Sequence, residues 1–136
     1  MKREAISVRQ LCSAIDDHAV FVLEEIKQIR LFEANSAIYR RGEAAASIYV
    51  LLEGRAVLMD QLYLQHSVRP GILCGMLEAL SGEPYASELT ALTPCICSVI
   101  ERVDLIEFLR RRPIVGLRLS QMISRDYHCL AESIRN

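Results

Sequence analysis

Residues 75–91 read GMLEALSGEPYASELTA, and this stretch decides the fold that we expect for the chain. Gly75 follows an apolar, strand-like run and precedes one turn of predicted helix, Met76 to Leu80. A turn signal at Ser81-Gly82-Glu83-Pro84 comes next, and an extended segment then ends at Ala91. A short helix whose free backbone N–H groups face a concave surface is suited to bind an anion. The stretch therefore predicts a helix and a turn between two strands, with anion binding as the chemistry to test.

Short strand-like runs rich in β-branched and aromatic residues lie on both sides of this stretch. They are Ile38-Tyr39, Ile48 to Leu52, Ala56 to Met59, Tyr63 to Val68 and Gly71 to Cys74 before it, and Leu89 to Arg102, with a turn at Thr93-Pro94, at its end. Turn signals separate the early runs at residues 33–36, 41–43 and 53–55, and Glu53-Gly54-Arg55 is typical of a tight hairpin. Short strands at this spacing favour a sandwich or jelly roll over a parallel sheet.

Both ends of the chain carry helical patterns. Apolar residues recur every three or four positions from Ser7, which can cap the helix, to about Ile29. Asp104 is predicted to cap a short helix over Leu105 to Arg111. Pro113 suits the first turn of a last helix that reaches about Ser133. We therefore expect helices before and after a mainly β region.

These patterns predict a single α+β domain that is mainly β. A chain of 136 residues is large enough for one core and too short for two. We divide it into an N-terminal helical segment (residues 1–30), a jelly-roll β-roll (31–102) and C-terminal helices (103–136).

Composition and charge exclude several function classes. The formal net charge is −1, whereas nucleic-acid binders usually carry a clustered basic excess, so we expect no nucleic-acid partner for this chain alone. The longest nearly uncharged run, Leu89 to Ile100, is too short to span a bilayer and contains Pro94, so we expect no membrane partner. The N-terminal MKREAISVRQ has no apolar signal core, which predicts a cytoplasmic protein.

Catalytic and metal chemistry find little support in the sequence. His18, His66 and His128 lie far apart, and P-loop, HExxH and Gly-x-Ser-x-Gly motifs are absent, so we expect no enzyme. An odd number of cysteines, five, in a chain without an export signal is typical of reduced thiols. Cys95-x-Cys97 lacks a second paired motif, so we expect no metal site and no cofactor.

Residues 75–91 resemble the phosphate-binding cassette of the cyclic-nucleotide-binding domain family, which includes catabolite-activator-type bacterial regulators, kinase regulatory subunits and nucleotide-gated channels. That cassette runs roughly Gly-Glu-Leu-Ala-Leu, a short stretch with a Gly, then Pro-Arg-Ala/Ser-Ala-Thr-Val and an Ala. The positions that fit without a gap are Gly75, Leu77, Leu80, Gly82, Pro84, Ala86, Leu89 and Ala91. The phrases AIYRRGEAAASIYVLLEGRAVL (37–58) and VRPGILCG (68–75) are similar to the family's β-roll, with glycines at its corners. The resemblance covers roughly Leu31 to Ser133.

The two residues that carry the family's ligand chemistry differ in this chain. The resemblance implies that Met76 replaces the Glu that holds the ribose hydroxyl, and that Tyr85 replaces the Arg that pairs with the cyclic phosphate. Glu88 takes the place of a Thr and would repel phosphate if it faced the site. Losing two charge-assisted hydrogen bonds costs on the order of 3–6 kcal/mol, or about a hundred- to ten-thousand-fold in affinity. We therefore expect cAMP and cGMP to bind weakly or not at all.

Two functions follow from this degenerate cassette. The first is a stand-alone regulatory or sensor module that binds a small ligand other than cAMP or cGMP, or binds these only weakly. The residues expected to line its site are Gly75, Met76, Leu77, Glu78, Tyr85, Ala86 and Ser87. The alternative is a ligand-free dimerisation or protein-interaction domain in which Tyr85 and Met76 fill a vestigial pocket. A cavity on the order of several hundred cubic ångströms beside Tyr85 would favour the first function, and side chains filling that space would favour the second.

The last predicted helix carries an apolar stripe. Its members are Leu119, Met122, Ile123, Tyr127, Leu130 and Ile134. Alternating steps of three and four suit contact between helices. The stripe can dock on the domain's own roll. The resemblance to bacterial regulators instead implies a homodimer, which would form through Leu119, Ile123, Tyr127 and Leu130. It also implies a sensor domain of the catabolite-activator type. The 136 residues leave no room for a winged helix-turn-helix after the last predicted helix, so we expect this chain to lack the DNA-binding domain of those regulators.

Overall fold

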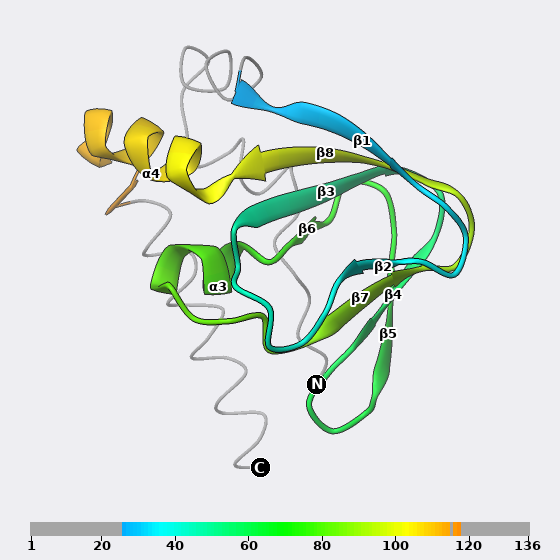
Figure 1. Cartoon of the computed structure of the whole chain (residues 1–136). Helices are drawn as coiled ribbons and strands as arrows, with labels where there is room; N and C mark the ends of the chain where they lie inside the picture. Colours follow the sequence, from blue (N-terminus) through cyan, green and yellow to red (C-terminus); the bar gives the residue numbers. More distant parts are fainter. Residues whose placement is uncertain (1–25, 115, 118–136) are drawn as a thin grey trace.

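The computed structural model describes residues 26–114, 116 and 117, and in this part of the chain two four-stranded antiparallel sheets pack together (Figure 1). The first sheet has the strand order β1 (Gln28–Phe32), β8 (Cys95–Glu101), β3 (Ser47–Glu53) and β6 (Leu73–Cys74). The second has the order β2 (Ala37–Tyr39), β7 (Glu88–Ala91), β4 (Ala56–Met59) and β5 (Gln65–Val68). This arrangement confirms the prediction of a mainly β jelly roll.

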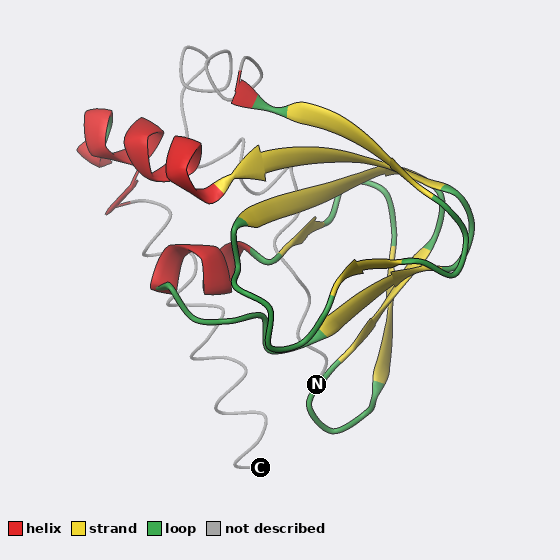
Figure 2. Cartoon of the chain, viewed as in Figure 1, coloured by secondary structure: helices red, strands yellow, loops and turns green. Residues whose placement is uncertain are grey.

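Two helices, α3 (Met76–Ser81) and α4 (Arg102–Arg111), lie at the same end of the sheets in the described part of the chain (Figure 2). α4 continues directly from β8, and its residues Leu105 and Phe108 are buried. The helix therefore begins earlier than the predicted start at Leu105. Glu101 precedes it in extended backbone, and Asp104 lies inside the first turn, where a carboxylate favours the helix dipole.

The core contains apolar side chains from both sheets and both helices. Its largest fully buried side chains are Ile48, Leu73, Leu105, Val99, Cys95 and Cys97. Cys74, Cys95 and Cys97 are free and buried. Burial raises the pKa of the Cys74 thiol to about 12 and that of the Cys97 thiol to about 11. The thiols of Cys74 and Cys97 therefore stay protonated at neutral pH and pack as small apolar groups.

Strand β1 corrects the prediction that a helix reaches Ile29 and that the roll begins at Leu31. Residues 28–32 pair with β8 in antiparallel register, with Arg30 opposite Cys97. The run QIRLF alternates polar and apolar residues, so it fits a strand as well as the end of a helical period. Pairing with β8 satisfies the backbone groups on the side of β1 that faces β8, and this non-local contact decides the conformation.

Gly54 forms a corner between the two sheets, and the tight hairpin predicted from Glu53-Gly54-Arg55 is therefore wrong. The flanking strands β3 and β4 belong to different sheets. Gly54 has φ +100°, and a Cβ built on it would lie 2.5 Å from the carbonyl oxygen of Pro94. Because a second backbone segment passes this closely at the corner, only glycine leaves enough room.

Strands β4 and β5 form a hairpin whose connection, Asp60 to Leu64, we call the hairpin tip. Strand β5 starts at Gln65, so the run predicted from Tyr63 is shorter than expected. Tyr63 has φ +63°, which places it in the left-handed region. The Asp60 carboxylate accepts the N–H groups of Leu62 and Leu64 at 2.8 and 3.0 Å, and these bonds fix the turn.

Some predictions concern residues outside the described part of the chain. These are the helix from Ser7 up to residue 25 and the last helix beyond Leu117, together with its apolar stripe. Within the described residues, no helix is long and apolar enough to cross a membrane.

Candidate functional site

The cassette (residues 75–91) has the predicted backbone. Helix α3 begins after Gly75 (φ +86°) and ends before Gly82 (φ +78°), whose N–H donates to the Glu78 carbonyl at 2.9 Å. A Cβ on Gly75 would lie 2.8 Å from Cε1 of the Tyr85 ring. Gly75 is therefore required twice, by its left-handed backbone and by the ring packed against it.

Tyr85 points into the interior of the domain and is only 4% exposed. Its ring stacks on Tyr39, with 3.9 Å between the ring centroids and 15° between the planes. Its hydroxyl donates to the Ser47 carbonyl at 2.5 Å and accepts the Ser47 N–H at 3.3 Å. Burial raises the pKa of Tyr85 to about 12, so the side chain is neutral at neutral pH. It supplies no positive charge to pair with a phosphate.

Two further predicted site residues are also buried. Met76 is 5% exposed and belongs to the apolar core, where its flexible thioether fills space beside the strands. Ser87 is 8% exposed. Burial raises the pKa of the nearby Tyr39 hydroxyl, and Ser87 lowers it to a smaller extent. Neither Met76 nor Ser87 lines the groove beside the cassette, which is described below.

The backbone donors next to Tyr85 are occupied by other groups of the chain. The Tyr85 N–H donates to the Glu43 carbonyl at 3.0 Å, and the Gly42 N–H donates to the Tyr85 carbonyl at 2.9 Å. The Ala86 N–H donates to Oε2 of Glu78 at 3.1 Å. A carboxylate of the protein thus binds the Ala86 donor, and it would repel an incoming anion. This role of Glu78 was not evident from the sequence, because it depends on the fold of the Ser81 to Pro84 turn.

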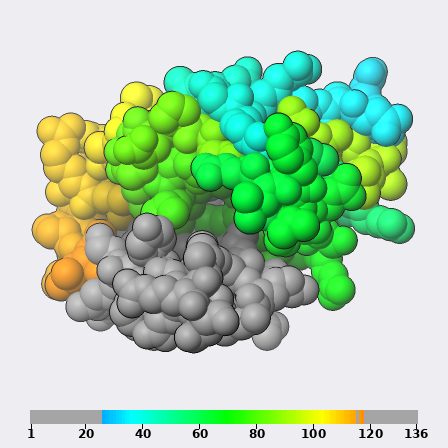
Figure 3. All heavy atoms as spheres, turned by 90° about the horizontal axis from the view of Figure 1, so that it is seen from below, coloured from blue at the N-terminus to red at the C-terminus, as the bar shows by residue number. Residues whose placement is uncertain are grey.

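An open groove of about 560 Å³ lies on the outer side of the cassette. Its lining residues are Arg41, Gly42, Gln61, Leu77, Glu78, Ser81, Glu83, Pro84, Tyr85 and Ala86. The groove brings together Leu77, Glu78, Tyr85 and Ala86 of the predicted set, whereas Gly75, Met76 and Ser87 do not line it. In Figure 3 the cassette and the β4–β5 hairpin form neighbouring green surfaces on this face.

Glu88 does not line the groove. It lies half-buried in β7, opposite Met59 of β4. Of the two carboxylates Glu78 and Glu88, Glu78 is the one that accepts a backbone N–H of the cassette.

Arg41 is a groove residue that sequence reasoning missed. Its guanidinium donates to the Ala86 carbonyl at 3.1 Å and to the Asp60 carbonyl, and it lies over the Tyr63 ring, 5.5 Å from the centroid. Arg41 thus joins the cassette to the hairpin tip. The only signal in the sequence is its place in the Arg41-Gly42-Glu43 turn, which does not indicate these distant partners.

Comparison with known proteins gives one family match. Residues 29–112 match the family model described as cyclic nucleotide-binding domain. Among curated proteins, the patatin-like phospholipase domain-containing protein ZK370.4 of Caenorhabditis elegans is 31% identical over 100 residues. The match covers 71% of this chain and 7% of that protein, so the chain spans a small part of the length of this relative.

Solved structures share the fold at low sequence identity. The catabolite activator protein of Thermus thermophilus has a TM-score of 0.77 and 18% identity, over 92% of this chain and 61% of that one. The N-terminal domain of a transcriptional regulator from Streptomyces coelicolor A3(2) has a TM-score of 0.72 and 22% identity, over 90% of this chain and 91% of that one. The regulatory subunit of a cAMP-independent protein kinase A from Trypanosoma brucei has a TM-score of 0.71 and 19% identity, over 90% of this chain and 45% of that one.

Proposed function

Because the chain belongs to the cyclic nucleotide-binding domain family, we propose that it is a regulatory domain whose cassette is filled by its own side chains and that works without cAMP or cGMP. The observation that carries the proposal is the buried Tyr85, which takes the place of the family's phosphate-binding Arg. A phosphate at this position would have to displace a ring that stacks on Tyr39 and a hydroxyl bound to Ser47. In this role the domain acts through contacts with other proteins or domains.

The hydrogen bond between Glu78 and the backbone of the cassette supports the same proposal. The Glu78 carboxylate already accepts the Ala86 N–H, so this donor is satisfied without a ligand. An unpaired buried donor costs about 1–3 kcal/mol, and the internal bond removes that cost from the empty cassette. One structural neighbour, the Trypanosoma brucei kinase subunit, is described as cAMP-independent, so this fold is compatible with regulation of that kind.

The groove supports a second candidate function, a sensor for a small ligand other than a cyclic nucleotide. Its volume, about 560 Å³, lies within the range of about 300–1,000 Å³ that is usual for ligand pockets. Leu77 is 47% exposed on one wall and offers an apolar contact. Arg41 and Glu78 offer polar ones, although each already makes an internal hydrogen bond. A ligand here would lie outside the roll and leave Tyr85 in place.

Calorimetric titration with cAMP and cGMP at moderate salt tests the main proposal. We expect no heat from the natural protein up to millimolar nucleotide. The double variant Met76→Glu/Tyr85→Arg restores the two missing contacts and should gain about a hundredfold or more in affinity. A matched control, Met76→Gln/Tyr85→Gln, opens the same space without charge and should gain nothing. Micromolar binding by the natural protein would overturn the proposal. Circular dichroism would establish that each variant is folded.

The homodimer is a separate proposal. It rests on the apolar stripe at Leu119, Ile123, Tyr127 and Leu130, which lies outside the described residues. Light scattering after gel filtration should give the mass of a dimer for the natural protein and of a monomer for Ile123→Asp. Ser124→Asp, next to the stripe but not in it, should remain a dimer. A monomeric natural protein would refute this part of the proposal. The cytoplasmic location also stays a prediction.

A further inference from the structure

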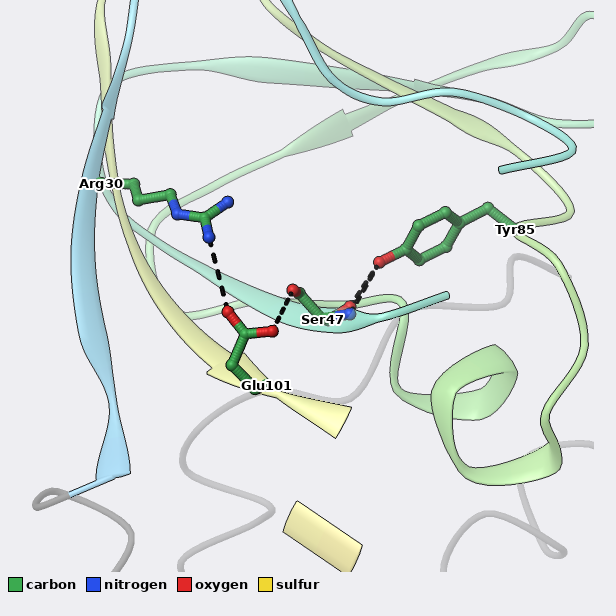
Figure 4. A network of polar contacts seen from close by, with 4 residues as sticks. All are labelled: Arg30, Ser47, Tyr85 and Glu101. Atoms are coloured by element: carbon green, nitrogen blue, oxygen red, sulfur yellow. Dashed lines mark hydrogen bonds and ion pairs between the residues drawn. The ribbon is translucent and has the colours of Figure 1, made fainter. Parts of the chain in front are cut away.

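The buried Tyr85 is connected to the start of helix α4 through strand β3 (Figure 4). Its hydroxyl binds both backbone groups of Ser47, the first residue of β3. Ser47 lies opposite Glu101 in the β3–β8 register, and its hydroxyl donates to the Glu101 carboxylate at 3.4 Å. Arg30 of β1 binds the other oxygen of that carboxylate, also at 3.4 Å. Because Glu101 immediately precedes α4, these contacts link the cassette to the residue that begins the helix.

Arg102 makes a second connection, directly between the two helices. It is the first residue of α4, and its N–H donates to the Ala46 carbonyl at 2.7 Å. Its side-chain Nε donates to the Ala79 carbonyl of α3 at 2.6 Å. The last four carbonyls of a helix have no intrahelical partner, so Arg102 satisfies a group that α3 leaves open.

Both connections begin in the cassette and end at the junction of β8 and α4. The first passes from Tyr85 through Ser47, and the second passes from Ala79 to Arg102. Ala46 and Ser47 are neighbours in the chain, so the two connections meet in one segment before and at the start of β3. A shift of α4 away from the cassette would therefore break hydrogen bonds on both routes.

We propose that Tyr85 and Arg102 are positioning residues that hold the start of α4 against the cassette in one pose with no ligand bound. The Tyr85 ring packs on Tyr39 of the second sheet and its hydroxyl binds Ser47 of the first sheet, so this one side chain joins the cassette to both sheets. This inference concerns the placement of α4, and it stands whether or not a small ligand occupies the groove.

Amide hydrogen exchange over residues 102–111 tests the proposal on the full chain. Tyr85→Phe keeps the ring and its stacking and removes only the hydroxyl. We expect it to speed exchange in α4 by about two- to tenfold, the range for one net hydrogen bond. Arg102→Met keeps the apolar stem of the side chain and removes its hydrogen bond to Ala79. We expect it to speed amide exchange in both α3 and α4 to a similar degree. The double variant should exchange faster in α4 than either single variant.

Tyr39→Phe is the matched control. It also removes one buried tyrosine hydroxyl from the same stacked pair, but that hydroxyl lies near Ser87 and belongs to neither of the two hydrogen-bonded routes to α4. We expect α4 to exchange at the natural rate in this variant. Unchanged α4 exchange in Tyr85→Phe would overturn the proposal. So would an equal increase in Tyr39→Phe, because the effect would then be a general loss of stability.

Discussion

Tyr85 and Tyr63 are the same residue type in two opposite settings. Tyr85 lies in the cassette, 4% exposed, stacked on a second tyrosine and hydrogen-bonded at its hydroxyl. Tyr63 lies at the hairpin tip, 72% exposed and in left-handed backbone, with Arg41 over its ring. The comparison shows that the same side chain belongs to the packed core in one setting and to the surface in the other: an aromatic ring in the interior stabilises the fold, whereas a ring at the surface does so little.

The largest expected effect comes from truncating the two rings. Tyr85→Ala should lower the free energy of unfolding by about 3–5 kcal/mol, the usual cost of removing a large buried ring. It also leaves the Ser47 backbone groups without their partner. Tyr63→Ala should change the same quantity by less than about 1 kcal/mol, because only an exposed cation–π contact is lost. Urea denaturation measures both values. An equal loss of unfolding free energy in the two variants would contradict the difference that we infer between the buried and the exposed tyrosine.

Gly75→Ala should have the next largest effect, about 2–3 kcal/mol. The new methyl group would meet the Tyr85 ring at 2.8 Å in a backbone conformation with φ +86°. In the Tyr85→Ala background the clash is gone, so only the left-handed backbone, about 1 kcal/mol, should remain as a cost. A double-mutant cycle by urea denaturation measures this coupling. Strict additivity would show that the ring and Gly75 do not constrain each other.

The smallest effect concerns pH at the hairpin tip. A hydrogen bond from His66, at 2.9 Å, together with the N–H groups of Leu64 and Leu62, lowers the pKa of the Asp60 carboxyl. Because the folded pKa lies below the unfolded one, this contribution to stability is present above the ordinary carboxyl pKa and is lost as pH falls through the lowered value. Amide chemical shifts of Leu62 and Leu64 should report the loss in acid.

Asp60→Asn provides the control for that titration. The amide has no carboxyl to titrate, so the acid-dependent change at Leu62 and Leu64 should disappear, while amides in the cassette keep their natural shifts. If the cassette amides moved with the same midpoint, the hairpin tip would not be the origin of the titration.

Much of the fold was predictable from local patterns. The turn glycines, the apolar strand runs and the helix after Gly75 follow from preferences that neighbouring residues set, and the structure confirms them. Strand β1 and the tight hairpin at Gly54 were predicted wrongly from local patterns, because each conformation depends on a segment far along the chain, whereas the resemblance to the family's β-roll correctly implied a glycine corner. Arg30 pairs opposite Cys97 in β8, and Gly54 passes the Pro94 carbonyl.

The candidate site, like the fold, was predictable from the sequence only in part. The sequence by itself determined that positions 76 and 85 hold Met and Tyr. The resemblance to the family then predicts that the Glu and the Arg that pair with a cyclic nucleotide are missing. Only the tertiary structure decided that the Tyr85 ring turns inward onto Tyr39 and that Glu78 binds the Ala86 N–H. Residue type fixes which charges and hydrogen bonds are possible. The direction in which a side chain points depends on where its partners lie, and Ser47 meets Tyr85 only when the sheets have formed.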